Sequence, residues 1–134
     1  MRKLTTILLA LILLTGCMDI NTTDPIETYK YWAGDKPPDS LKVLKGQYWQ
    51  STHWSREYIM YLKLKPTKEW WNKFLEQNHL PINKDKWVRP SEAPSWFEPT
   101  ENSIKYGIGG NFDQGSRYFQ DTLTGVCYIY EIQL

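Results

Sequence analysis

The sequence is poor in cysteine, with only Cys17 and Cys127 among its 134 residues. Cys127 lies in VCYIYE, a run typical of a β-strand, and no neighbour in the sequence would lower the pKa of its thiol. We expect Cys127 to be a small buried apolar residue. A reactive thiol or an intermolecular disulfide is the alternative for this residue.

An excess of charge of one sign is also missing. The 16 basic and 15 acidic residues are scattered along the chain without a basic stripe. Nucleic-acid binding requires clustered Lys and Arg side chains that neutralise phosphates. We therefore predict that no nucleic acid is a partner.

The sequence contains no catalytic or metal-binding motif. Glu57 lies four residues after His53, but on a turn-to-strand segment that spacing does not place both on one face, and Cys and His do not cluster. The glycines of GIGGNF (107–112) precede another strand rather than a helix, which excludes a phosphate-binding loop. We predict no enzyme, no cofactor and no metal; a catalytic site assembled from distant residues is the alternative.

No apolar run is long enough to cross a membrane. Leu4 to Gly16 is 13 residues, or about 20 Å of helix, against a hydrocarbon core of about 30 Å. Arg2 and Lys3 precede this run and small residues end it. That order is typical of a secretory signal peptide.

The ending LTGC (14–17) resembles the lipobox of bacterial lipoproteins in residue order, spacing and context. The resemblance covers residues 1–17. It implies cleavage before Cys17, which then carries lipid such as palmitate on its thiol and its new amino group, so that no internal disulfide is possible. Acyl chains contribute roughly 0.8 kcal/mol per buried methylene, and several together anchor a domain stably. The alternative is an ordinary signal peptide followed by an unrelated cysteine.

The residues after Cys17 bear on its location. Enteric lipoproteins with Asp directly after the modified cysteine stay in the inner membrane, whereas Met18 stands there in this chain and Asp19 follows. The resemblance therefore favours the outer membrane of the bacterial cell envelope, with the domain facing the periplasm or the cell surface.

Composition divides the chain into three segments. Residues 1–16 are the predicted signal peptide, 17–28 the lipidated cysteine with a flexible tether, and 29–134 a single small domain. The tether is polar and aperiodic, with an expected reach of about 20 Å. Tyr29, Tyr31 and Trp32 follow it and are expected to hold the chain against the domain.

Hydrophobic periodicity predicts the fold class. Alternation with period two predicts strands in 41–50 and 57–66 and about three more after residue 103, the last two joined by a turn at 123–125. Residues 67–80 change to helical spacing, with Thr67 as N-cap and an aromatic stripe expected to be core. We predict an α+β fold, in which an antiparallel sheet of about five strands has one amphipathic helix packed on one face.

Seven Trp, nine Tyr and four Phe are the most distinctive part of the composition, and aromatic residues serve both cores and binding surfaces. Trp96 and Phe97 lie between prolines in a long loop and are candidate binding residues. The interpretation we favour is that they turn inward and hold the loop. His53 and Trp54, between the first two predicted strands, are further candidates.

Two functions fit these observations. The first is a protein-interaction module that binds an envelope protein, as immunity factors and assembly accessories do; size and anchoring are the only basis for that analogy. The second is a small-ligand or glycan-binding lipoprotein, in which Trp rings stack on sugars and Asn111, Asp113 and Gln114 supply polar contacts. A purely structural lipoprotein is a third possibility.

Overall fold

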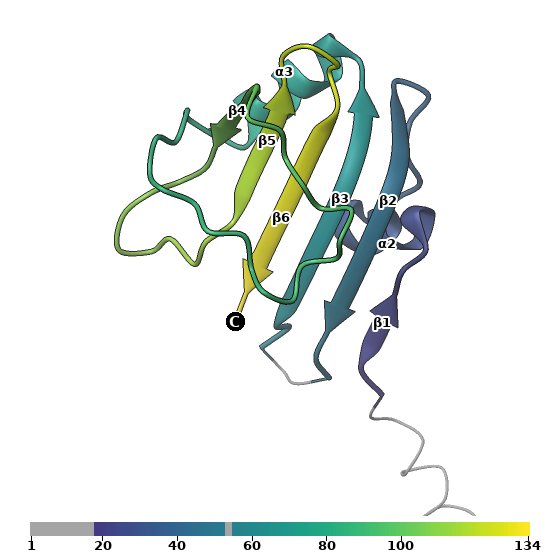
Figure 1. Ribbon diagram of the computed structural model, residues 1–134. Helices are drawn as coiled ribbons and strands as arrows, with labels where there is room; N and C mark the ends of the chain where they lie inside the picture. Colours follow the sequence, from purple (N-terminus) through teal and green to yellow (C-terminus); the bar gives the residue numbers. More distant parts are fainter. Residues whose placement is uncertain (1–17, 53–54) are drawn as a thin grey trace, which may run out of the picture.

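The computed structural model describes residues 18–52 and 55–134, and this part of the chain forms a six-stranded sheet with two helices (Figure 1). The predicted α+β class is confirmed, with one strand and one helix more than expected. The elements are β1 Ile20–Thr22, α2 Pro25–Ala33, β2 Leu41–Gln50, β3 Tyr58–Pro66, α3 Lys68–Gln77, β4 Ser103–Tyr106, β5 Arg117–Asp121 and β6 Cys127–Gln133.

All strand pairs are antiparallel, in the order β1-β2-β3-β6-β5-β4. The last strand of the chain, β6, lies in the middle of the sheet beside β3, with Leu62 opposite Ile129 and Tyr61 opposite Tyr130. Helix α3 and the long loop after it carry the chain from β3 to the far edge, where β4 begins. The sheet then returns to the centre through β5 and β6.

Strand β1 and helix α2 form where a flexible tether was expected, so that part of the interpretation is wrong. Asp24 caps α2 by accepting a hydrogen bond from the Glu27 amide at 2.8 Å, and Gly34 ends the helix with a left-handed φ of 79°. The helix packs closely on β2: a Cβ added at Gly46 would lie 2.7 Å from the Thr28 side chain. Gly46 is therefore required by the close approach of α2.

Helices α2 and α3 cover one face of the sheet, behind it in Figure 1. Thr67 caps α3 as predicted, accepting from the Trp70 amide at 3.2 Å. Trp71 is completely buried, and Phe74 packs between Trp32 of α2 and Tyr118 of β5, with ring centroids 5.7 and 5.6 Å away. The aromatic stripe of α3 is core, as predicted. No described helix is long and apolar enough to span a bilayer.

The loop between α3 and β4 crosses the opposite face of the sheet, in front in Figure 1. Its central residue is Phe97, which is fully buried and packs against Tyr61 and Tyr128 with ring centroids 5.1 and 5.5 Å away. Arg89 fixes the loop by donating hydrogen bonds to the carbonyl groups of Ala93, Pro94 and Phe97 at 2.6–3.0 Å. These carbonyl groups lie in irregular backbone, where no helix or strand supplies hydrogen-bond donors. The Arg89 guanidinium supplies donors in their place.

We expect Phe97→Ala to destabilise the fold by about 3–5 kcal/mol, because it empties the centre of an aromatic cluster. Chemical denaturation of the purified protein measures the change. Leu123→Ala is the control: this side chain is 78% exposed in the β5–β6 turn, and its truncation should change stability by less than about 0.5 kcal/mol. Equal effects of the two substitutions would contradict a core role for Phe97.

Candidate functional site

Three predicted site residues, Cys17, His53 and Trp54, lie outside the described residues. Trp96 and Phe97 are in the core on the loop-covered face: Trp96 is half-buried and its ring lies 6.1 Å from that of Phe97, which has no exposed surface. Phe97 is therefore unavailable to a partner, in contrast to the binding role considered for it. The inward orientation that we favoured is the one observed.

Asn111 and Asp113 lie in the loop between β4 and β5. Asn111 is exposed. The Asp113 carboxylate forms a bidentate pair with the Arg117 guanidinium, with N–O distances of 2.6 and 2.9 Å, and also accepts from the Gly115 amide at 2.8 Å. The hydrogen bonds from Arg117 hold the pKa of Asp113 below its usual range. Asp113 thus shapes the loop rather than presenting a free carboxylate.

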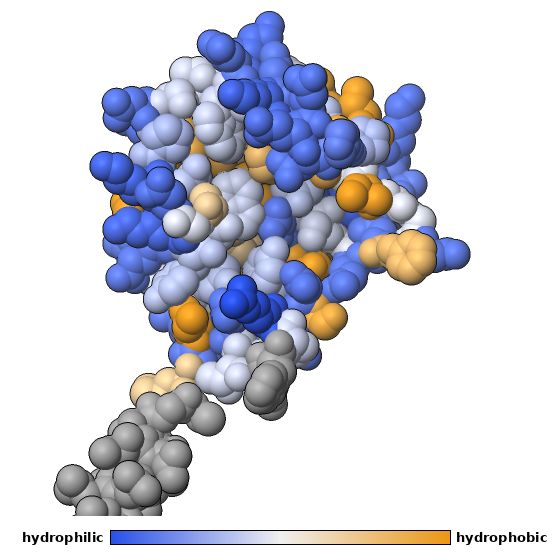
Figure 2. All heavy atoms as spheres, turned by 180° about the vertical axis from the view of Figure 1, so that it is seen from behind, coloured by the Kyte–Doolittle hydropathy of each residue, from blue (hydrophilic) through white to orange (hydrophobic). Residues whose placement is uncertain are grey.

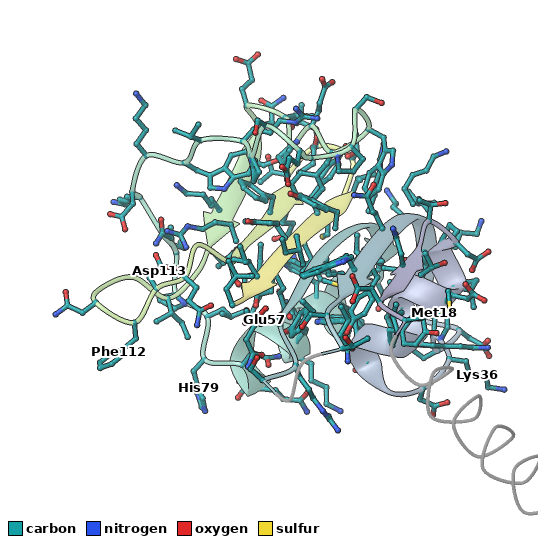
Figure 3. The ribbon with its side chains drawn as sticks, turned by 90° about the horizontal axis from the view of Figure 1, so that it is seen from below. Met18, Lys36, Glu57, His79, Phe112 and Asp113 are labelled. Atoms are coloured by element: carbon teal, nitrogen blue, oxygen red, sulfur yellow. The ribbon has the colours of Figure 1, made fainter. Side chains whose placement is uncertain are left out.

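The same loop carries the most exposed aromatic side chain of the described residues, Phe112, which was not among the predicted site residues. Phe112 is 96% exposed and points away from the domain at the loop tip, and Ile108 is 57% exposed (Figure 3). Figure 2 shows apolar side chains among polar ones on this flank of the helix-covered face. An almost fully exposed Phe is unfavourable in water, and clustered apolar exposure marks interaction surfaces.

A groove of about 350 Å³ lies beside Phe112. The groove forms because β5 begins only at Arg117, so that the last residues of β6 lie beside the β4–β5 loop on the side where β5 would continue. There the Ser116 hydroxyl accepts a hydrogen bond from the Ile132 amide at 3.1 Å. The groove is bounded by β3, β5, β6, the residue Leu80 after α3, and this loop. Its lining residues are Tyr58, Leu80, Ile108, Phe112, Asp113, Gln114, Ser116, Tyr118, Glu131, Ile132 and Gln133.

The Glu131 carboxylate lies in this groove between two tyrosines. Tyr58 donates to one oxygen at 2.8 Å and Tyr118 to the other at 2.7 Å. The strand register brings the three side chains together. Glu131 is opposite Met60 on β3, two residues from Tyr58. On the other side, Tyr118 of β5 is opposite Ile129, two residues from Glu131. Burial, and next the Glu131 charge, raise the pKa of both phenols, so that they remain protonated donors.

A second hollow of about 240 Å³ adjoins the groove across Tyr58. Its wall is a row of nearly parallel rings: Tyr31 stacks on Tyr48 and Tyr48 on Tyr58, with centroid distances of 5.2 and 5.8 Å. Arg56 lines the hollow and is exposed. Together the two hollows make a tyrosine-rich recess at one end of the helix-covered face.

Cys127 does not supply a reactive thiol to the recess. It is completely buried under the helices, and burial raises the pKa of its thiol to about 12, which suppresses the reactive thiolate. The described residues include no group of three or more His, Cys, Asp and Glu side chains placed to hold a metal ion. The aromatic walls, the Glu131 carboxylate and the apolar rim of the recess are features of recognition surfaces.

No protein-family model, no curated protein and no solved structure matches the chain. We therefore infer function from the residues of the groove and from the resemblance at the N-terminus.

We expect Glu131→Gln to lower the pKa of Tyr58 and Tyr118, because the neutral amide no longer repels a phenolate. Both values should stay above the ordinary tyrosine value, since burial, the larger cause, persists. Spectrophotometric titration of the tyrosines at alkaline pH measures this change, with the exposed Glu101→Gln as control.

The same titration has a consequence for stability. A phenol whose pKa is raised on folding stabilises the native state below its unfolded pKa, and that contribution is lost as the pH rises through the folded pKa. Stability of the unmodified protein should therefore fall more steeply at alkaline pH than that of Glu131→Gln. Identical profiles for the two proteins would contradict a close contact between Glu131 and the phenols.

Proposed function

We propose that the protein is a lipid-anchored, non-catalytic interaction module of the bacterial cell envelope, of the immunity or accessory type, that binds an envelope protein through the groove beside Phe112. The observation that carries the proposal is the 96% exposure of Phe112 at the rim of this groove. Aromatic residues beside a pocket are typical anchors of protein interfaces.

The start of β1 and the groove belong to the same end of the sheet. Ile20, Gln50, Tyr58 and Gln133 lie in one row across β1, β2, β3 and β6, and Tyr58 and Gln133 line the groove. Only three residue steps separate Cys17 from Ile20, which is at most about 10 Å of extended chain. A lipid on Cys17 would thus hold the groove near the membrane, and the partner is expected there, at the outer membrane by the resemblance above.

Glycan binding has weaker support. Sugar rings stack on exposed Trp faces, but every tryptophan in residues 18–52 and 55–134 is buried or half-buried. Asp113 is paired with Arg117, and the Gln114 side chain accepts from the Leu134 amide at 2.8 Å. Two of the three polar residues assigned to a ligand are therefore engaged within the protein.

The lipid anchor predicts a simple labelling result. Cells grown with labelled palmitate should incorporate label into the unmodified protein and into Cys127→Ala, whose substitution leaves the lipobox intact. Cys17→Ala should lose the label and leave the membrane fraction, because the acyl chains supply the membrane affinity. Label retained by Cys17→Ala would contradict the anchor.

The binding surface predicts a site-specific crosslink. A photoreactive benzophenone amino acid replacing Phe112 in the full-length protein should give a discrete adduct with one envelope protein in intact cells. The same group replacing Leu123, which is also exposed but lies in the β5–β6 turn, should give none. The adduct should also disappear when Ile108→Ser removes a neighbouring apolar contact. Equal adducts at 112 and 123, or none at 112, would contradict the proposed surface.

A further inference from the structure

Glu131 gives the groove a negative charge that forms no ion pair among the described residues; the exposed Arg56 lines the adjoining hollow rather than the groove. Among the residues that the structure describes, the groove lining includes two carboxylates and no Lys, Arg or His. Asp113 is paired with Arg117, and that ion pair is the only one among residues 18–52 and 55–134. Glu131 has two phenol donors, and no cation of the described residues lies within ion-pair distance of it. A partly buried carboxylate of this kind favours a cationic ligand, since desolvated charge is costly without a partner.

The aromatic surroundings of Glu131 favour a planar cation. Tyr58 and Tyr118 approach its carboxylate from opposite sides, and the Tyr58 ring continues the stack with Tyr48 at an interplanar angle of 15°. A guanidinium donates parallel hydrogen bonds to both oxygens of a carboxylate and stacks on aromatic faces, whereas an ammonium is a compact, strongly hydrated point charge. Each Glu131 oxygen accepts one phenol and has capacity for a further donor.

The rim of the groove is apolar. Leu80, Ile108 and Phe112 border it, the last two well exposed. A side chain that reached Glu131 would bring its flanking residues against this rim. Apolar neighbours of the cation would cover the exposed Phe112, which a free small cation would not.

We propose that the groove binds an arginine side chain of the partner protein, with its guanidinium on the Glu131 carboxylate between Tyr58 and Tyr118, and the apolar neighbours of that arginine against Ile108 and Phe112. This inference rests on the proposed function and names the chemistry of the segment that the partner presents. It also means that an acidic segment is rejected, because it would meet the Glu131 charge.

The test uses two peptides on the full-length protein in detergent micelles: acetyl-Leu-Arg-Leu-amide, and the same peptide with citrulline, which has nearly the shape of arginine without its charge. Titrations followed by ¹H–¹⁵N spectra should show the arginine peptide shifting amide signals of β3, β6 and residues 107–116. Its affinity should exceed that of the citrulline peptide by about tenfold or more, as expected for a hydrogen-bonded charge pair. This comparison needs no variant, so it is independent of any folding defect.

Glu131→Gln should reduce the preference for arginine to nearly none, while the exposed Glu101→Gln should retain it. The spectrum of each variant without peptide reports whether it is folded. Equal binding of the two peptides to the unmodified protein, or an unchanged preference in Glu131→Gln, would overturn the arginine inference. Absence of shifts with either peptide would overturn it as well. A partner adduct at position 112 would still support the proposed function in each of these cases, so the two failures are distinguishable.

Discussion

Burial of both faces of the central strands β3 and β6 is the constraint on which the rest of the structure depends. Leu62 and Ile129 are fully buried beneath the helices, while Tyr61 and Tyr130 stack at 5.0 Å on the other face. An antiparallel sheet commonly leaves one face to solvent, but this sheet is apolar on both. The described part of the chain supplies helices for one face only, and the irregular loop held by Arg89 and Phe97 covers the other.

The groove exists because these covers end before the strands do. Helix α3 ends at Gln77 and the chain turns away after Leu80, while β5 starts only at Arg117. The end of β6 is therefore paired with β3 on one side and, within the described residues, has no strand on the other. Glu131 occupies a position on the helix-covered face where an apolar residue is usual. Hydrogen bonds from Tyr58 and Tyr118 replace part of the solvation that its carboxylate loses.

Prediction from the sequence succeeded where the signal was local and strongly periodic. The alternation in β3, the helical stripe of α3 with its Thr67 cap, and the turn at 123–125 all appear in the structure. Helix α2 was missed although Asp24, Pro25 and Gly34 are good start and stop residues. Only Thr28 and Tyr29 of this helix are buried, so its hydrophobic pattern is weak. Its stability comes from packing on β2 at Gly46, which the sequence pattern of the helix does not show.

The sequence by itself determined the α+β class, most strand and helix positions, and the resemblance of residues 1–17 to a lipoprotein signal, because each depends on residues close together in the chain. Only the tertiary structure decided which aromatic residues are core and which are exposed, burying Phe97 and exposing Phe112. It also decided the contact between Tyr58 and Glu131, which are 73 positions apart. Such a pair is set by the register of β3 against β6, and register is fixed by packing across the whole sheet.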